Sequence, residues 1–262
     1  MAISKLHNKL YFSDVPGLKI SIITVCYNAV NTVERCILSV AAQNYPNIEH
    51  IVIDGASTDG TVDIITTHKN TLDTVVSEPD KGIYDAMNKG IALATGDVIG
   101  MLNADDLYAD DNVLANIAAA FANNTIDALY GDLDYIDKAG KVVRKWRSGN
   151  YAAGKFNWGW MPPHPTFFCR SSLYKTHGLY SLDHGTAADY ELMLRFVHLK
   201  QVAVFYLQKI MVKMNTGGVS NSNLANRVSS LLCDYRAMKN NQVKMPVVAL
   251  ILKPLSKLRQ FF

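Results

Sequence analysis

Acidic side chains follow two apolar runs in the first half of the chain. One run, residues 98–102, leads into the sequence NADD at 103–106, and the other, residues 48–53, leads into Asp54. Such runs are typical of buried strands, and open α/β sheets bind ligands beyond the carboxyl ends of their strands. Because hard divalent cations prefer oxygen ligands, we predict a Mg2+ or Mn2+ site at Asp105, beside a diphosphate.

Helix capping is the alternative interpretation of these polar segments. Residues 103–106 precede a helix expected through 112–121, and residues 57–59 precede one expected near Thr61. Short polar side chains at such positions cap the first turn of a helix. Residues 103–106 taken alone leave both interpretations open, and the second acidic segment favours a ligand site. In that segment we expect a functional role for Asp54 and capping by residues 57–59.

Strands and helices alternate through the first hundred residues. A β-branched run at 20–27 precedes residues 31–34, which have the spacing of a capping box, and a strand at 74–77 precedes a helix at 83–94. This alternation predicts an α/β fold with a mostly parallel central sheet and helices on both faces. Neither GxGxxG nor GxxxxGKS/T follows these strands, which argues against a nicotinamide dehydrogenase and a P-loop enzyme.

The pattern changes after residue 106. Residues 128–136 and 142–146 flank the turn sequence DKAGK, which predicts a β-hairpin, and residues 202–214 predict a long final strand. The sequence has no linker at this change of pattern. We therefore predict one continuous domain.

Composition bounds the class of protein. The 262 residues are 49% hydrophobic and 19% charged with a net charge of +3, which is ordinary for a folded domain and gives no reason to expect nucleic acid as a partner. The four cysteines are scattered without ligand spacing, so we expect free thiols in a reducing compartment. We find neither a signal peptide nor an apolar stretch long enough to span a membrane, and expect a cytoplasmic protein.

Five sequence segments identify a family resemblance. In order they are SIITVCYN, IVIDGASTDGT, EPDKGIYDAMNKGI, GDVIGMLNADD and AADYELMLR. On these motifs, which span roughly residues 19–215, the chain resembles the inverting glycosyltransferases of family 2. The resemblance implies a GT-A fold and a Mn2+- or Mg2+-dependent, hexosyltransferase-type transfer from a UDP-, GDP- or dTDP-linked sugar to a glycan acceptor.

The resemblance also divides the chain into functional parts. Residues 1–18 would be an N-terminal extension and 19–220 the glycosyltransferase domain. Within that domain, residues 19–106 would bind the nucleotide-sugar and 107–220 the acceptor. Residues 221–262 would form C-terminal helices with a basic amphipathic tail.

Individual site residues follow from the same resemblance. Those implied to contact the nucleotide-sugar are Val25, Tyr27, Asn28, Asp54, Lys81, Asp85, Asn88, Asn103, Ala104 and Asp105. Asp105 would also be the metal ligand. Local alternatives are a plain strand-to-helix turn after residue 27 and a surface ion pair between Asp85 and Lys89. Asn103 stands where the family usually has an acid, which removes one charge from the metal site.

Asp189 is implied to be the catalytic base, because it matches the second acid of the family's late motif. The local alternative is an acid stabilised by the dipole at a helix N-terminus, an interaction of about 0.3 to 1 kcal/mol. Ala188 stands where the family usually has another acid. Loss of that acid removes one local charge and leaves the base in place.

An aromatic segment precedes this late motif. Phe156, Trp158 and Trp160 either fill the core or form a stacking platform for the sugar rings of the acceptor, which we favour. His164 lies between two prolines and is therefore extended. It could contact the acceptor, contact phosphate or pack internally.

The C-terminal segment 239–262 has five basic residues and no acid. As a helix from Pro246 it would be amphipathic, with a kink at Pro254, and such a helix lies in a membrane interface or docks on protein. We favour peripheral attachment to the cytoplasmic membrane face, near a polyprenyl-diphosphate-linked acceptor of bacterial surface polysaccharide synthesis. The sequence leaves the sugar, the nucleotide, the acceptor and the oligomeric state open.

Two other functions remain as alternatives at this point. A nucleotidyltransferase on a related sheet would be expected to have a glycine-rich basic loop near the N-terminus, which the chain lacks. A catalytically inactive glycan-binding protein would not need Asp54, Asp105 and Asp189. Only an activity measurement separates that protein from an enzyme.

Overall fold

Parallel strands form the N-terminal part of the sheet in the computed structural model, which describes residues 17–216 and 224–261. They are β1 (Ile20–Cys26), β2 (Ile48–Asp54), β3 (Thr74–Ser77) and β4 (Val98–Met101). β1 lies between β2 and β4, and β3 pairs with the outer edge of β2. Nearly all side chains of β1, β2 and β4 are buried, and strands buried on both faces have continuous apolar sequences.

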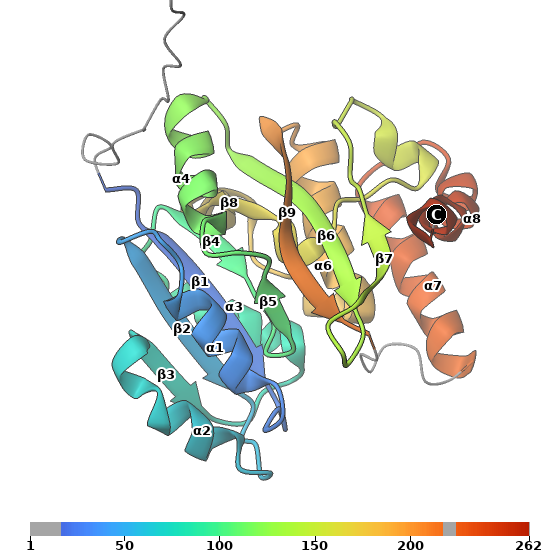
Figure 1. The fold of residues 1–262 in the computed structure, drawn as a ribbon. Coiled ribbons are helices and arrows are strands. Elements are labelled where there is room, and N and C mark those ends of the chain that lie inside the picture. The colour runs from blue at the N-terminus through green and yellow to red at the C-terminus, as the bar shows by residue number, and fades with distance from the viewer. Residues whose placement is uncertain (1–16, 217–223, 262) are drawn as a thin grey trace, which may run out of the picture.

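Helices cover both faces of this parallel layer (Figure 1). α3 (Ile83–Leu93) packs on one face, so closely that a Cβ at Gly90 would lie 2.4 Å from Cγ2 of Ile23. The opposite face is covered by α1 (Val33–Ala41), α2 (Thr61–Thr67) and α4 (Val113–Asn123). The apolar runs of the strands are therefore enclosed, and only the strand ends remain accessible to a ligand.

The second half of the chain adds five strands to the same sheet. They are β5 (Asp106–Tyr108), β6 (Ala128–Ile136), β7 (Val142–Trp146), β8 (Phe168–Arg170) and β9 (Val204–Asn215). β8 joins the two halves by pairing antiparallel with β4 and β6, and β9 pairs parallel with β6 and antiparallel with β5. The order is β3-β2-β1-β4-β8-β6-β9-β5, with β7 on β6. The predicted α/β fold and hairpin are confirmed.

The remaining elements are short turns and the later helices. Between β7 and β9 lie the 3-10 turns Lys155–Trp158, His164–Thr166 and Leu182–Ala187, α5 (Ser171–His177), α6 (Ala188–Met193) and a π-helical turn, Leu194–Leu199. The chain then forms α7 (Leu224–Asn240), α8 (Pro246–Ser256) and the 3-10 turn Lys257–Phe261. α7 and α8 stand at the opposite end of the molecule from β3 (Figure 1).

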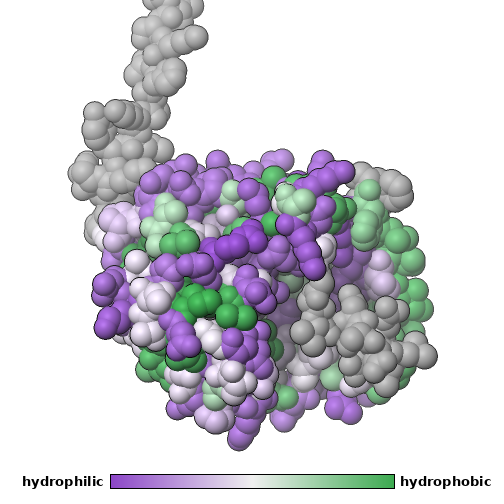
Figure 2. All heavy atoms as spheres, turned by 60° about the horizontal axis from the view of Figure 1, so that its bottom comes forward, coloured by the Kyte–Doolittle hydropathy of each residue, from purple (hydrophilic) through white to green (hydrophobic). Residues whose placement is uncertain are grey.

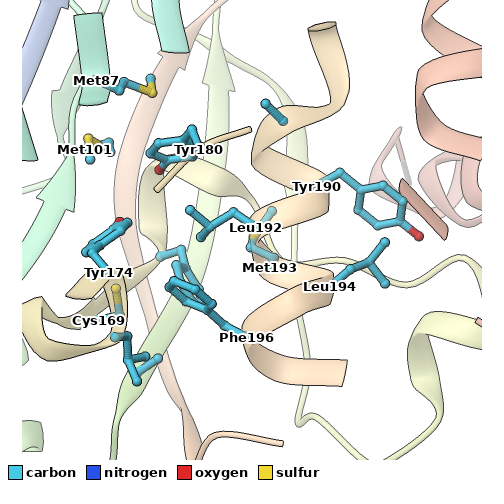
Figure 3. Close-up of a cluster of buried hydrophobic side chains, with 14 of the residues drawn as sticks. Met87, Met101, Cys169, Tyr174, Tyr180, Tyr190, Leu192, Met193, Leu194 and Phe196 are labelled. Carbon is cyan, nitrogen blue, oxygen red and sulfur yellow. The ribbon is translucent and has the colours of Figure 1, made fainter. Parts of the chain in front are cut away.

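The larger hydrophobic core lies between the sheet and α6. Figure 3 shows Leu192 and Phe196 pointing into it, toward Tyr174 and Tyr180. Tyr190 points to the other side of α6, where its ring lies under the ammonium group of a lysine of α8. α6 is therefore held by the main core on one side and by the C-terminal helices on the other.

The C-terminal segment is helical from Pro246, as predicted, and it docks on the protein through its polar face. Lys253 is only 8% exposed, and its Nζ lies 2.7 Å from Oδ1 of Asp234 in α7. Gln260 is buried and accepts a hydrogen bond of 2.7 Å from Nε of Arg144. Ala249 is also buried and Leu250 packs on the main core. Most of the other large apolar side chains lie on the outside and are exposed at Val247, Val248, Ile251, Leu255, Leu258 and Phe261.

Pro254 lies inside α8, which continues to Ser256 before the change to a 3-10 turn. Figure 2 shows apolar side chains along the flank formed by α7 and α8. Within the described residues, no helix is long and apolar enough to cross a membrane. All four cysteines are free thiols, as predicted, and three of them are buried.

Candidate active site

The loops that follow β1 and β2 are joined at the carboxyl end of the sheet, which Figure 2 turns toward the reader. Asn28 has a left-handed backbone with φ of +49°, its N–H donates to Oγ of Ser57 at 2.8 Å, and its side-chain oxygen accepts from the N–H of Thr58 at 3.0 Å. The N–H of Val30 donates to Oδ2 of Asp59. Asp59 thus serves the loop structurally, as expected, and Asn28 holds two loops together.

Tyr27 and the loop after β3 complete this edge. A Cβ at Gly55 would lie 2.5 Å from Oδ2 of Asp80 and 3.4 Å from the ring of Tyr27, so the third loop packs directly on the second. The Tyr27 side chain is 67% exposed. A large aromatic side chain left in solvent at a strand edge offers a stacking surface for a planar ligand.

Asp54 and Val25 are more enclosed than the sequence led us to expect. The Asp54 carboxylate is buried and accepts hydrogen bonds from Ser57 Oγ (2.5 Å), Ser57 N (3.0 Å), Ser77 Oγ (2.7 Å) and Cys26 Sγ (3.5 Å). Burial alone would raise its pKa, and these hydrogen bonds lower it below the usual value. A nucleobase could bind Asp54 only by replacing a present partner. The side chain of Val25 packs in the core.

The residues expected along the diphosphate have different surroundings. The Lys81 side chain is exposed, and its backbone N–H donates to Oδ2 of Asp85 at 3.0 Å. Asn88 hydrogen-bonds through its amide to both the N–H and the carbonyl of Tyr180. Lys89 forms an ion pair of 2.8 Å with Glu78, so the alternative pairing with Asp85 is not formed. Among Lys81, Asp85 and Asn88, the three residues expected along the diphosphate, Lys81 has the most exposed side chain.

The segment after β4 carries the predicted metal site. Ala104 is buried, and its N–H donates to the carbonyl of Val25 at 3.3 Å. The carbonyl of Asp105 accepts from Nδ2 of Asn215 at 2.5 Å, which ties this segment to the end of β9. The Asp105 side chain is half-buried, and burial raises the pKa of its carboxyl. Oδ1 of Asn103 is buried without a hydrogen-bond partner among the described residues.

These residues fit a divalent cation that takes most of its ligands from elsewhere. Asp105 supplies one carboxylate, and the unpartnered oxygen of Asn103 is a second donor of the hard type. No group of three or more His, Cys, Asp or Glu able to hold a metal occurs in 17–216 and 224–261. A metal held here would depend on phosphate oxygens and water to complete its coordination.

Asp106 differs sharply from its neighbour. It is fully buried at the start of β5, and neither carboxylate oxygen has a partner among the residues that the structure describes. Burial, together with the charge of Asp105, raises the pKa of Asp106 well above its usual value. The two adjacent acids are therefore one half-exposed carboxylate and one enclosed carboxyl group, a difference that the sequence did not show.

Asp189 lies in the first turn of α6 and is half-exposed. Tyr84 and His164 lie near Asp189. The pKa of the Tyr84 phenol is raised by burial and further by the charge of Asp189. Burial lowers the pKa of His164, and the charge of Asp189 opposes that lowering. Tyr84 Oη donates to the carbonyl of Thr186 at 3.3 Å. Asp189 takes part in none of the ion pairs found among the described residues.

The three predicted acceptor residues divide into two groups. Trp158 is 59% exposed. Trp160 is half-buried, packs edge-on against Phe156 and donates its indole N–H to the carbonyl of Ser148 at 2.9 Å. His164 is buried and its Nε2 lies 2.7 Å from Oη of Tyr180, so internal packing is the role that its contacts describe.

Tyr180 lies among the predicted site residues, although no sequence pattern indicated it. It contacts His164 through its hydroxyl, Asn88 through its backbone and Tyr84 through its ring, with centroids 5.6 Å apart. It lies outside all five quoted motifs, in a turn without a periodic pattern. Only the packing of α3 against the segment before α6 brings it to the site.

Comparisons with known proteins identify the family of this chain. The sequence model of the family "Glycosyl transferase family 2" matches residues 21–177. The chain belongs to this family. An uncharacterized glycosyltransferase of Mycobacterium tuberculosis is 31% identical over 87% of this chain and 85% of its own length. A PGL/p-HBAD biosynthesis glycosyltransferase of Mycobacterium bovis is 30% identical over 77% of this chain and 79% of its own. The protein is thus a glycosyltransferase.

Two solved structures show that its fold is of the GT-A type. S. aureus TarS aligns with a TM-score of 0.64 and 20% identity over 86% of this chain and 39% of that chain, so this glycosyltransferase spans well under half of TarS. The mannosyltransferase PcManGT from Pyrobaculum calidifontis, in complex with GDP-Man and Mn2+, aligns with a TM-score of 0.65 and 17% identity over 89% of this chain and 69% of that chain. Similarity at this level of identity describes the fold alone.

Proposed function

We propose that this glycosyltransferase transfers a sugar from a nucleotide-sugar to a hydroxyl group of a glycan acceptor with inversion at the anomeric carbon. The observation that carries the proposal is the state of Asp189. Its carboxylate is half-exposed beside Tyr84 and takes part in none of the ion pairs of the described residues. A carboxylate in this state can accept a proton from a bound acceptor.

The proposed reaction is a single displacement. The acceptor hydroxyl attacks the anomeric carbon from the face opposite the nucleoside diphosphate, so the configuration at that carbon inverts. The hydroxyl has a high pKa, and its proton must leave as the new bond forms. Asp189 accepts that proton, while the bond to the diphosphate breaks and the nucleoside diphosphate leaves with the electron pair.

Asp105 and Asn103 would hold a Mn2+ or Mg2+ ion next to the diphosphate. When bound, the ion offsets the charge that develops on the leaving diphosphate. The half-buried carboxylate of Asp105 and the unpartnered oxygen of Asn103 support this assignment. The Mn2+ in the PcManGT complex supports it as well.

A nucleotide-sugar is the proposed donor, with Tyr27, Asn28 and Asp54 nearest the nucleoside and Lys81 nearest phosphate. The exposed ring of Tyr27 and the exposed side chain of Lys81 support this orientation. Solved complexes of the fold relatives contain UDP, UDP-GlcNAc or GDP-Man. We therefore retain UDP-, GDP- and dTDP-sugars as candidates.

The proposed acceptor is a lipid-linked glycan, reached at the cytoplasmic face of a membrane. The exposed apolar side of α8 supports this location, together with the exposed side chains of Lys239 and Lys244 in the same acid-free segment. Each basic residue near anionic lipid contributes about 1 kcal/mol to binding. The relative named for PGL/p-HBAD biosynthesis supports a role in surface glycan synthesis.

The test begins with a thermal-shift screen of UDP-, GDP- and dTDP-sugars with Mn2+, since a donor at 100 times its Kd should add about 2.7 kcal/mol of stability. The products of the active donor then separate the alternatives. A glycosyltransferase releases a nucleoside diphosphate, a nucleotidyltransferase releases pyrophosphate, and an inactive glycan-binding protein releases neither. NMR of the transferred sugar reports whether its configuration has inverted.

Asp189→Asn tests the assignment of the base. We expect turnover to fall by about 10²- to 10⁴-fold, with donor affinity nearly unchanged, because Asp189 acts on the acceptor. Asp183→Asn is the control, since Asp183 is an exposed acid in the preceding turn. Retention of most of the turnover by Asp189→Asn would show that another group is the base.

A further inference from the structure

A pocket of about 710 Å³ lies between β7, the 3-10 turn Lys155–Trp158 and α8, outside the residues assigned to the donor. The size is within the usual range of ligand sites, about 300 to 1,000 Å³. All three tryptophans of the chain line it: Trp146, Trp158 and Trp160. The pocket therefore gathers every indole ring of the chain on its wall.

The charged side chains that line the pocket are all cationic: Lys145, Arg147, Lys155 and Lys257. Arg147 is partly neutralised, because its Nη2 lies 2.7 Å from Oδ1 of Asp134. The three lysines take part in no ion pair among the described residues. Three lysines without an ion-pair partner along one cavity favour an anionic ligand with several acceptor oxygens.

The lysines and the indole rings lie close enough to bind one ligand together. Nζ of Lys155 lies 5.7 Å from the centre of the Trp160 ring, and Nζ of Lys257 lies 5.6 Å from that of Trp146. Burial lowers the pKa of Lys257, the charges of Lys253 and Arg144 lower it further, and those of Asp234 and Asp189 oppose the change. A bound anion would offset the repulsion from Lys253 and Arg144. The indole faces offer apolar surface for the ring of a sugar joined to that anion.

The pocket is connected to the helix that carries Asp189. Trp160 packs edge-on against Phe156 with centroids 5.1 Å apart, and Phe156 packs against Tyr190, the residue after Asp189, at 6.2 Å. On the other side the pocket reaches the exposed apolar face of α8, because Leu255 belongs to both. A ligand bound here would lie between the tryptophans that pack toward α6 and the exposed surface of α8.

We infer that this pocket binds the phosphate or diphosphate group that joins an acceptor glycan to its lipid, with the first sugar ring against the tryptophans. This inference rests on the proposed function, since it names the chemical class of the acceptor for the same transfer. The lysines recognise the phosphoryl oxygens, the indoles recognise the adjoining sugar, and the apolar face of α8 lies where the lipid continues.

Tryptophan fluorescence tests the inference directly, because every tryptophan of the chain lines the pocket. The full chain is titrated with farnesyl diphosphate in EDTA, which prevents metal-dependent binding at the donor site. We expect a saturable fluorescence change, and competition by inorganic pyrophosphate. An equal change with farnesol would mean that the site recognises the apolar chain, and would overturn the inference.

Paired variants assign the binding to the lysines. Combining Lys145→Gln with Lys257→Gln should weaken farnesyl diphosphate binding by at least about tenfold, since two charge-assisted contacts are lost. The control pair, Lys69→Gln with Lys138→Gln, removes two lysines outside the pocket and should change nothing. If Lys257→Gln disturbs α8, Lys145→Gln alone retains the test, because Lys145 is exposed on β7. Equal affinity of all variants would overturn the inference.

Two further measurements separate the sources of phosphate and the two proposals. Phosphatidylglycerol vesicles that gave the same lysine-dependent fluorescence change would identify a membrane head group as the ligand and overturn the acceptor assignment.

Asp189→Asn should bind farnesyl diphosphate normally. Binding without release of nucleoside diphosphate from any nucleotide-sugar would remove the proposed function and leave the pocket assignment standing. Transfer to a lipid-diphosphate acceptor with unchanged KM in the double lysine variant would overturn the pocket assignment and leave the proposed function standing.

Discussion

The proposed donor edge of the sheet, formed by the loops after β1 and β2, and the C-terminal helix α8 orient their polar side chains in opposite ways. At this edge, polar groups bind one another: Asp54 accepts four hydrogen bonds from three residues and Asn28 joins two loops, while Tyr27 remains exposed. In α8 and the turn after it, Lys253 and Gln260 point inward, and most of the large apolar side chains face solvent. An amphipathic pattern therefore identifies two faces of an element without identifying which one meets the protein.

Gly159→Ala should disrupt the packing of α8 on the protein, and we expect it to have the largest effect on stability. Gly159 has φ of +75°, and a Cβ there would lie 2.4 Å from the backbone N of Lys253. We expect a loss of about 2 to 4 kcal/mol in the free energy of unfolding, measured by urea denaturation, with unchanged donor binding. Gly140→Ala is the matched control, because its φ is +80° and no atom lies within 4 Å of the added Cβ. Equal losses in both variants would mean that close packing on α8 is unimportant.

Asp54→Ala tests whether Asp54 only holds the loops of the proposed donor edge together or also binds the donor. The loss of a hydrogen bond to a charged group should weaken the free energy of donor binding by about 1.5 to 3 kcal/mol, with no change in the preferred metal. Ser77→Ala is the companion variant, because it removes one partner of Asp54 and leaves the carboxylate in place. Calorimetry is decisive here: a change below about twofold in donor Kd, with a lowered free energy of unfolding, would make Asp54 a purely structural residue.

His50 provides a pH test of how tightly the parallel layer is enclosed. Burial lowers its pKa to about 3, and Nε2 lies 3.0 Å from Oγ1 of Thr24. The unfolded chain binds a proton below pH 6.5 that the folded chain does not bind, so stability falls as the pH is lowered from 6.5 toward 3. By pH 5 the loss at this site is about 2 kcal/mol.

His50→Gln should therefore flatten the pH dependence of the free energy of unfolding between pH 5 and 6.5. The lowered pKa of His164 contributes in the same direction, so part of the slope should remain. His177→Gln is the control, because His177, at the end of α5, takes part in none of the ion pairs of the described residues. An unchanged slope in His50→Gln would show that this histidine becomes protonated without unfolding.

Ile251→Lys should have the smallest effect on folding and a clear effect on membrane contact. Ile251 is 58% exposed, and exposed substitutions usually change the free energy of unfolding by no more than about 0.5 kcal/mol. Sedimentation with uncharged phosphatidylcholine vesicles should nevertheless decrease, because the apolar surface is interrupted and the added lysine gains nothing from a neutral lipid surface. Leu93→Lys, at an exposed leucine of α3, is the control. Equal sedimentation of wild type and Ile251→Lys would leave α8 without a membrane role.

The sequence by itself determined the elements and the family. Continuous apolar runs predicted β1, β2 and β4, since strands covered on both faces need no polar alternation. The turn between residues 136 and 142 predicted the β6–β7 hairpin. The ordered motifs placed Asp105 and Asp189 in named roles, which the structure leaves as proposals. All of these features depend on residues that are close together in the chain or on a fixed order of segments.

Only the tertiary structure decided what each side chain contacts. It separated half-buried Asp105 from enclosed Asp106, although the two are adjacent, because β5 pairs with β9 more than a hundred residues away. It brought Tyr180 to Asn88 and turned Lys253 inward, because Asp234 and Tyr190 lie beneath α8. Burial and pKa depend on the summed surroundings from distant segments, and local sequence patterns do not contain that sum.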